Sequence, residues 1–587
     1  MLYEPLYFRL KYFYGDYMRL IKPFFLTVLA VALSCCQTVS SVDPGALVVT
    51  PMGPIQGVLT QDDDIYNFKG IPYAVPPLGH LRWAPPKETD NWSETKLANN
   101  YGNRCMQPDD TEDGYFDRLI EGHGLNKFLT YLIKKGVASQ KPSPMSEDCL
   151  YLNIRTDNIN GSKKERKLKP VMVWIHGGGH QFGSGDLSYY QNNALVKQGV
   201  ILVTINYRLG VMGYMAHPAL SKSDSNGVSG NYGTLDQIAA LKWVQKNITA
   251  FGGDPNNVTI FGESAGAWSV TELMATPLAK GLFHKAIGQS GASSYHMGQM
   301  AEEGVGWPSG YKTGLEVTKA LGLEDPTAEE LRNIPAHIIQ NVITEKMSEG
   351  FHHIRDGYVY PENVGLAFSK NKYNKVPMLF GYNADEGTLF FPDDEQPTVW
   401  LPDLSPGSKE ELTMRLKEFF PTNHEKLVDL YSLDKDFTRG GTQWMGDEIF
   451  GVNIRYVTRQ NEIHGGKSYL YHFSRVPPSN KQTIGAFHAA EIPFVFGSYD
   501  KTIGYSKEDI KLAELMQNYW VNFAKNGNPN GYNLPEWPLH KNKNWMKFTA
   551  NTGEDSKEIK YLREEKLDAL EEGLLLLLEE LEEIQSQ

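Results

Sequence analysis

The 587-residue sequence lacks both an excess of positive charge and long apolar runs. Its 57 Lys and Arg residues face 70 Asp and Glu residues, and the net charge of −13 excludes a generally basic surface for nucleic-acid phosphates. No segment offers the roughly 20 consecutive apolar residues that a membrane-spanning helix needs. We therefore predict no nucleic-acid partner, and no transmembrane anchor once an N-terminal signal is removed.

Cofactor motifs are missing as well. No cluster of His, Cys and carboxylate residues has the spacing of metal ligands. The glycine-rich segment 177–179 fits neither the dinucleotide-binding pattern nor the P-loop. The sequence therefore predicts no metal ion and no organic cofactor.

The chain has no repeat of fixed period and no Pro/Ser-rich linker between residues 44 and 560. Apolar runs rich in β-branched and aromatic residues are typical of strands buried on both faces. Such runs predict strands at 171–175, 200–205, 257–261, 376–381 and 468–473. A helical pattern over 235–248 predicts a strand–helix–strand crossover. We predict one α/β domain over residues 44–560, with long insertions.

The N-terminal region has the pattern of an export signal. About a dozen apolar residues, Phe24–Ser34, follow two positive charges. Residues 1–36 are therefore predicted to be a signal peptide, with Met18 as an alternative start, and the protein is predicted to be secreted or held in the cell envelope. Cys35 closes a loose match to a lipoprotein cleavage box, so lipid anchoring through Cys35 or Cys36 is a second hypothesis.

Two cysteines, Cys105 and Cys149, would remain after such a cleavage. An even pair in an exported chain favours a disulfide. Two separate buried thiols are the alternative.

Residues 561–587 form an acidic, leucine-rich tail. From Glu564 to Gln587 there are nine acidic residues and one lysine. Leucines and one isoleucine recur there at spacings of three and four, which predicts an amphipathic helix interrupted by Gly573. Its apolar face predicts either docking on the body of the protein or self-association.

The strongest chemical motif is Gly262-Glu263-Ser264-Ala265-Gly266, which lies between a predicted strand and a predicted helix. A nucleophilic serine on a strained strand-to-helix turn requires this context. Glycines two positions on either side allow the neighbouring elements to approach. The helix N-terminus presents the Ala265 N–H and a positive dipole end, and both suit a developing oxyanion.

His176-Gly177-Gly178-Gly179 directly follows the 171–175 strand. Glycines at the end of a strand expose backbone N–H groups. In acyl transfer such donors hold the carbonyl oxygen as it becomes an anion, and this predicts oxyanion donors in the segment Gly177–Gly179.

A nucleophilic serine needs a histidine base, and the base needs a carboxylate that fixes its tautomer. After the motif, His488 lies in a loop of small residues, whereas His472 lies in a predicted strand. Asp385 and Glu386 follow the 376–381 strand, and both qualify as the acid by spacing alone.

Several motifs together resemble the type-B carboxylesterase family, which also contains cholinesterases and related lipases. The resemblance covers roughly residues 45–550. The matching segments are 68–74, 146–153, 174–179, 206–210, 262–266, 385–387 and His488 with Glu491.

This resemblance implies an α/β-hydrolase fold, with a mostly parallel central sheet and helices on both faces. It implies the catalytic residues Ser264, Glu386 and His488, and the oxyanion donors Gly178, Gly179 and Ala265. It also implies a Cys105–Cys149 disulfide and a structural ion pair between Arg82 and Glu147.

The sequence departs from the family in three places. No Trp lies between Cys105 and Cys149, where cholinesterases carry the aromatic that receives a quaternary ammonium, so choline esters are not predicted substrates. No Cys follows Cys149, so a second disulfide of many animal members is missing. Position 180 is His where members commonly carry an aromatic, which bears on the shape of the acyl pocket.

The predicted function is a serine hydrolase that cleaves small-molecule or lipid carboxylic esters through an acyl-enzyme. One alternative is a lipase for longer-chain lipid esters, with residues 106–148 as its lid. The other is a non-catalytic, cholinesterase-like binding protein, a branch that commonly loses catalytic residues.

Overall fold

The computed structural model describes most of the chain from residue 46 onward. The predicted signal peptide with Cys35 and Cys36, and most of the predicted lid, lie outside the described residues. The described residues are 46–60, 63–108, 122, 143–159, 167–295, 298–301, 308–346, 350–390, 408–476, 482–499, 504–541, 543–549, 557–560 and 562–586.

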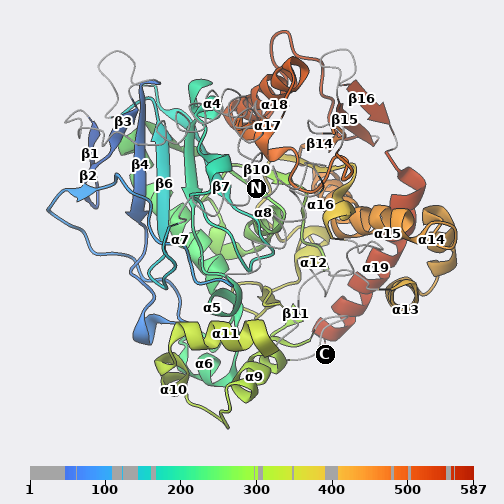
Figure 1. Ribbon diagram of the computed structural model, residues 1–587, viewed down its shortest axis with the longest axis horizontal. Helices are drawn as coiled ribbons and strands as arrows, with labels where there is room; N and C mark the ends of the chain where they lie inside the picture. The colour runs from blue at the N-terminus through green and yellow to red at the C-terminus, as the bar shows by residue number, and fades with distance from the viewer. Residues whose placement is uncertain are drawn as a thin grey trace, which may run out of the picture.

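An 11-stranded sheet forms the centre of the molecule (Figure 1). Strands β8, β7, β9, β10, β13, β14 and β15 run parallel, and antiparallel strands complete both edges. In spatial order the strands are β16 (Lys557–Lys560), β15 (Asn544–Phe548), β14 (Ser468–Phe473), β13 (Met378–Asn383), β10 (Lys285–Gln289), β9 (Gly253–Glu263), β7 (Lys169–Ile175), β8 (Ile201–Ile205), β6 (Tyr151–Thr156), β4 (Ile65–Pro72) and β3 (Val58–Thr60).

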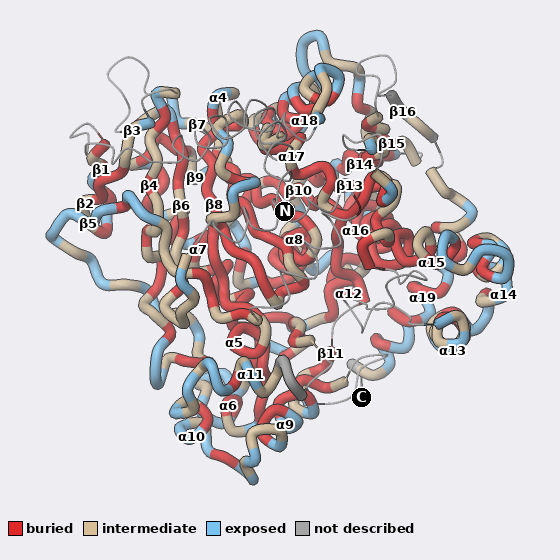
Figure 2. The backbone as a smooth tube through the Cα atoms, in the orientation of Figure 1, coloured by how far each residue is buried: buried red, intermediate tan, exposed pale blue. Residues whose placement is uncertain are grey.

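The central strands are apolar throughout because both of their faces are buried. In β7, Val171, Val173 and Ile175 enter one hydrophobic cluster, and the alternating Met172 and Trp174 enter the other. Figure 2 shows the central strands buried, whereas the peripheral helices mix buried, intermediate and exposed residues.

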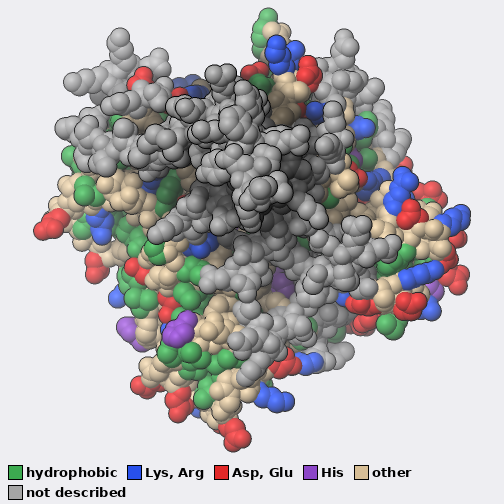
Figure 3. Space-filling model, viewed as in Figure 1, with side chains coloured by type: hydrophobic (Ala, Val, Ile, Leu, Met, Phe, Trp, Pro, Cys, Tyr) green, Lys and Arg blue, Asp and Glu red, His purple; other side chains and the backbone are tan. Residues whose placement is uncertain are grey.

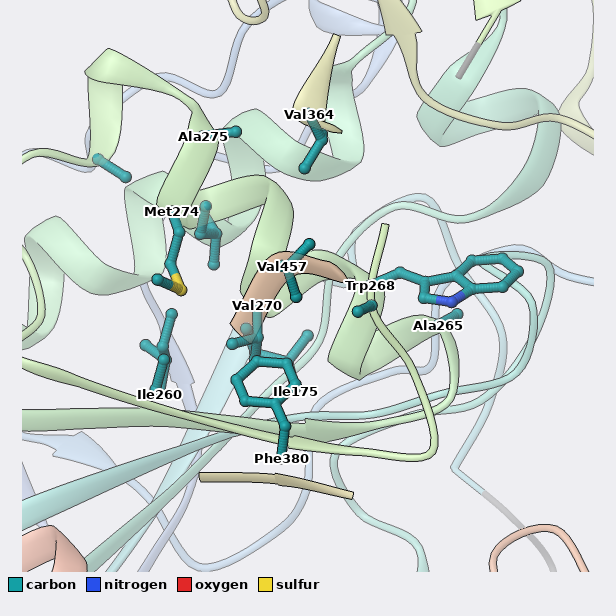
Figure 4. Packing of buried hydrophobic residues seen from close by; sticks show 14 of the residues in the cluster. Ile175, Ile260, Ala265, Trp268, Val270, Met274, Ala275, Val364, Phe380 and Val457 are labelled. Carbon is teal, nitrogen blue, oxygen red and sulfur yellow. The ribbon is translucent and has the colours of Figure 1, made fainter. Parts of the chain in front are cut away.

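Helices cover both faces of the sheet. One face packs against α7 (Tyr232–Asn247), α8 (Ala265–Ala275) and α16 (Val452–Ile463), and the other against α4 (Ala194–Lys197) and α18 (Lys507–Asn526). Figure 4 shows Val270 and Met274 of α8 pointing toward the sheet side chains Ile175, Ile260 and Phe380, whereas Trp268 points away. This mostly parallel sheet between helical layers confirms the predicted α/β-hydrolase fold.

Two helical groups flank this core in Figure 1. The lower group packs around its own hydrophobic cluster, which includes Trp83, Tyr214 and Leu331. It consists of α5 (Gly210–Tyr214), α6 (Pro218–Ser223), α9 (Gly310–Ala320), α10 (Ala328–Asn333) and α11 (Ala336–Lys346). The right-hand group consists of α13 (Lys409–Phe419), α14 (His424–Tyr431) and α15 (Phe437–Gly446).

The remaining elements are short. Helices α12 (Val364–Ser369) and α17 (Ile492–Phe496) accompany the layers on the sheet, and 3₁₀ and π turns connect several elements. Two small sheets complete the fold, one of β1 (Leu47–Thr50), β2 (Gly53–Gln56) and β5 (Lys96–Leu97), and one of β11 (Gly298–Gln299) and β12 (Ile354–Arg355).

The acidic tail forms helix α19 (Glu564–Ser586), which descends along the right of Figure 1 beside α13, α14 and α16. Its apolar stripe is buried in the main hydrophobic cluster, including Leu567, Leu570, Leu574 and Leu581. Gly573 does not break the helix. A Cβ there would lie 2.0 Å from the ring of Phe420, so glycine admits this aromatic side chain.

Two pairings implied by the family resemblance are present. Cys105 and Cys149 form a disulfide. The Arg82 guanidinium donates to both oxygens of Glu147, at 2.5 and 2.6 Å.

Charges are mixed on the face shown in Figure 3, where acidic and basic side chains are interspersed over α13 and α14. Among the helices of the described residues, none combines the length and apolar character needed to cross a membrane.

Candidate active site

Ser264 lies on a sharp turn between β9 and α8. Its backbone angles are φ 56° and ψ −127°, a conformation that a non-glycine residue adopts only when the surrounding structure enforces it. The Ser264 N–H donates to the Gln289 carbonyl at 2.9 Å, and the Ser264 carbonyl accepts from the N–H groups of Ala267 and Trp268. The side chain is only half-buried on this fixed turn.

The two glycines of the motif are required by contact. A Cβ at Gly266 would lie 2.1 Å from the carbonyl oxygen of Ile175 at the end of β7. A Cβ at Gly262 would lie 2.5 Å from the backbone of Gly266 itself. The backbones of the strand before Ser264, the helix after it and β7 therefore pack directly against one another, with no room for a side chain between them.

The glycine loop after β7 lies directly against this turn. A Cβ at Gly177 would lie 3.0 Å from Cβ of Ser264. Gly178 and Gly179 follow with φ of 102° and 61°, in the left-handed region that favours glycine. The Tyr207 hydroxyl donates to the His176 carbonyl at 2.8 Å and its ring stacks on the imidazole, which fixes the start of the loop.

His488 contacts a carboxylate through each of its ring nitrogens. Nδ1 lies 2.6 Å from Oε2 of Glu386. Nε2 lies 3.1 Å from Oε1 of Glu263, the residue immediately before Ser264. The rings of Phe390 and Phe450 lie against the imidazole, each with its centroid 4.9 Å away. The structure thus brings His488 to both the predicted acid and the serine turn.

The geometry separates the two candidate acids. Glu386 also accepts from the backbone N–H of Asn383 at 2.6 Å, which orients its carboxylate toward His488. Asp385 accepts instead from the backbone N–H of Ala486 at 2.8 Å. The adjacent carboxylates therefore have different partners, and the one on His488 is Glu386.

The site gathers three buried carboxylates around one imidazole. Burial raises the pKa of Glu263, His488 opposes that rise, and the nearby Glu491 and Glu386 add to it. Burial raises the pKa of Glu491 as well, although Asn383 and Gln289 donate to it. Burial alone would lower the pKa of His488, but the carboxylates of Glu263 and Glu386 outweigh it and raise that pKa.

The other late histidines lie elsewhere. His472 is buried within β14, and its burial holds its pKa well below the usual range. His540 lies 3.2 Å from Glu462, His464 contacts the Ser369 carbonyl, and His424 contacts the Pro421 carbonyl.

Sequence reasoning missed the contact of Glu263 with His488. The position of Glu263 directly before Ser264 was the only sequence signal that could have suggested this contact. It also missed a second buried group, His180, Glu272 and His353, whose ligand atoms lie within 4.8 Å of one another. These residues come from three separate segments, so no spacing could reveal them.

The chain is similar to known proteins over most of its length. The model of the carboxylesterase family matches residues 44–569. Fumonisin B1 esterase of Sphingopyxis macrogoltabida is 34% identical over 84% of this chain and 85% of its own. Para-nitrobenzyl esterase of Bacillus subtilis is 35% identical over 84% of this chain and 92% of its own. A solved structure of a PNB esterase matches 89% of this chain and 99% of its own, with 31% identity and a TM-score of 0.73.

Proposed function

Because the chain belongs to the carboxylesterase family and is a carboxylic ester hydrolase, we propose that Ser264 is its nucleophile, His488 its general base and Glu386 the acid that orients the base. We propose Gly178, Gly179 and Ala265 as the oxyanion donors. The single observation that carries the assignment is the contact of His488 with Glu386 on one side and with the residue before Ser264 on the other.

The first half-reaction makes an acyl-enzyme. Ser264 Oγ attacks the ester carbonyl carbon while its proton passes to His488 Nε2. The N–H groups of the oxyanion donors stabilise the negative carbonyl oxygen. His488 then returns the proton to the leaving alkoxide, and the alcohol departs.

Water completes the second half-reaction. His488 takes a proton from water, which attacks the acyl carbon, and the proton returns to Ser264 Oγ as the carboxylic acid leaves. Glu386 accepts a hydrogen bond from His488 Nδ1 and so fixes the tautomer of the imidazole. The strained turn contributes by keeping Ser264 fixed before the substrate arrives.

Small-molecule esters are the substrate class, and the relatives favour an esterase over a lipase. The names of two relatives, a fumonisin B1 esterase and a para-nitrobenzyl esterase, support trials with fumonisin B1 and with para-nitrobenzyl esters. The presence of Ser264, and the contacts of His488 with Glu386 and with the residue before the serine, oppose the alternative of a non-catalytic binding protein.

The decisive experiment is hydrolysis of p-nitrophenyl esters of increasing acyl length, with Ser264→Ala as the matched variant. We expect the fastest turnover with short chains and its loss in the variant. A maximum with long chains that rises at an oil–water interface would instead indicate a lipase. Wild-type protein that is folded but turns over no ester would overturn the proposed function.

We also infer that the protein is exported, on the strength of the Cys105–Cys149 disulfide and the apolar N-terminal run. Expression with and without residues 1–36 tests this inference. Activity outside the cytoplasm only with the segment present is expected. Recovery with a lipid-modified cysteine would favour anchoring through Cys35 or Cys36.

A further inference from the structure

A second group of chemically reactive side chains lies behind the serine turn, on the same helix. Glu272 projects from the later turns of α8, His180 follows the oxyanion glycines, and His353 immediately precedes β12. All three are fully buried, with exposed fractions of 0%, 0% and 1%. One ligand atom of each lies within 4.8 Å of the others.

The polar atoms of this group are poorly satisfied. His353 Nε2 lies 2.8 Å from Glu272 Oε1 as an ion-pair contact. Among the described residues, the bond angles leave both Glu272 oxygens and Nδ1 of both histidines without a well-formed hydrogen bond. The Tyr360 hydroxyl faces Glu272, and the Ala265 backbone faces His180. A buried carboxylate with few donors is stabilised by a cation beside it.

His180 is oriented for a ligand by its other nitrogen. Its Nε2 lies 2.9 Å from Ser269 Oγ, which also accepts from the Gln237 amide at 3.0 Å. A hydrogen bond at one ring nitrogen fixes the tautomer and the ring plane and leaves the other nitrogen for a metal.

We propose that His180, Glu272 and His353 form a buried site for one divalent transition-metal ion, Zn²⁺ in the first instance. Two imidazoles and one carboxylate are a common zinc ligand set, and metal–ligand distances of about 2.0–2.2 Å place tetrahedral ligand atoms about 3.4 Å apart. His353 Nε2 and Glu272 Oε1 lie 2.8 Å apart, and the ligand atoms of all three residues lie within 4.8 Å of one another. Small side-chain rotations bring these distances to the tetrahedral spacing. The fourth position is open to water or to Ser293, whose Oγ lies 3.4 Å from His353 Nε2.

The ion would join three segments around the active site. It would tie the loop that carries Gly178 and Gly179 to α8 behind Ser264, and both to the segment that precedes β12. Its role is structural, because Ser264 lies at the opposite end of α8 from Glu272. The proposal does not depend on the proposed catalytic roles.

The test is the metal content of the purified full-length protein after expression with added Zn²⁺ and exchange into metal-free buffer. We expect about one Zn²⁺ per chain by elemental analysis, and less than about one tenth of that in Glu272→Gln and in His353→Asn. Glu462→Gln is the matched control. It alters another buried His–Glu contact, that with His540, and should retain the ion.

A second measurement covers the case in which the variants fold poorly. Wild-type protein expressed with Co²⁺ should show the visible absorption of a tetrahedral cobalt site, and X-ray absorption of the zinc form should show nitrogen and oxygen neighbours from two histidines. Wild-type protein that retains no transition metal after either expression would overturn the proposal. Equal metal in wild type and folded Glu272→Gln would overturn it as well, because the ion would then bind elsewhere.

Discussion

A buried histidine–glutamate pair lies beside each end of helix α8, and the two pairs differ in their hydrogen-bond partners. Near its start, the Glu386 carboxylate accepts from the Asn383 N–H and contacts His488. Near its end, Glu272 contacts His353 but accepts no hydrogen bond of good geometry among the described residues. The first pair lies beside a half-buried serine. The second is sealed in the core, where the proposed ion would complete it.

The comparison shows that the same two residue types can have different chemical roles, depending on what surrounds them. Both pairs bring an imidazole and a carboxylate within 2.8 Å. The pair at the serine turn lies beside the half-buried Ser264 and the glycine loop, whereas the hydroxyl beside the second pair, that of Ser293, is buried. Substitutions at the two ends of α8 should therefore change different quantities.

Loss of the base should give the largest effect. His488→Asn removes the proton acceptor, and we expect kcat for a short-chain p-nitrophenyl ester to fall by about 10⁴- to 10⁶-fold with little change in folding. Steady-state kinetics and circular dichroism measure both. His540→Asn, which alters another buried histidine beside a carboxylate, should leave kcat unchanged. Comparable losses in the two variants would contradict the assignment.

Loss of the acid should be the next largest effect. Glu386→Gln keeps the shape but removes the charge that stabilises imidazolium and fixes its tautomer, so we expect kcat to fall by about 10⁴-fold. Asp385→Asn is a control one residue away, since Asp385 contacts the Ala486 backbone rather than His488. We expect that control to lose less than about tenfold. The reverse order of effects would assign the role to Asp385.

Asp447 is another buried carboxylate, and unlike Glu386 and Glu272 it is paired with an arginine, so its loss of pairing should change stability. It accepts from Arg563, Tyr382 and Tyr431, and Arg563 also donates to the Ala384 carbonyl beside the acid loop. Arg563→Met would leave this charge buried without its cation, and we expect a loss of about 3–5 kcal/mol in the free energy of unfolding.

Denaturant unfolding measures that loss, and Arg459→Met is its control. Arg459 is 42% exposed and pairs with Glu571 of α19, so its loss should cost about 1 kcal/mol or less. Equal effects would mean that burial of the Asp447 pair contributes nothing.

Removal of α19 tests the remaining prediction for the tail. Because its leucines are buried against the body, we expect a chain ending before Glu564 to lose stability. Self-association through this tail stays a prediction, and the mass of the full-length protein in solution tests it.

The sequence predicted those parts of the site that depend on local backbone geometry. Gly262 and Gly266 flank Ser264 because the crossing of β9, α8 and β7 leaves no room for a Cβ. This requirement for glycine falls within one short segment, so the sequence shows it directly. The strands were predictable because burial on both faces makes them apolar throughout. Predicted boundaries differ by a few residues, as for β9, which begins at Gly253 rather than residue 257.

Contacts between distant segments could not be predicted in the same way. Spacing left Asp385 and Glu386 equivalent, because the loop geometry that turns one toward Ala486 and the other toward His488 has no periodic signature. The cluster of His180, Glu272 and His353 depends on the packing of three segments. The amphipathic pattern of α19 predicted a helix, but an apolar stripe does not specify the surface on which it docks.

The smallest predicted effect concerns Glu263, which distinguishes the pair at the serine turn from a simple histidine–glutamate pair. Its carboxylate raises the pKa of His488, and His488 must be neutral to act as a base. Activity should therefore rise with pH as His488 loses its proton. Glu263→Gln removes a charge 3.1 Å from Nε2, so the pKa should fall and the acidic limb of kcat/KM should move to lower pH by roughly 1–3 units. Glu491→Gln, whose carboxylate is held by Asn383 and Gln289, should move it less. If the acidic limb stays in place in Glu263→Gln, Glu263 is protonated across the working range, because burial dominates its titration. The charge on His488 would then be set by Glu386 alone.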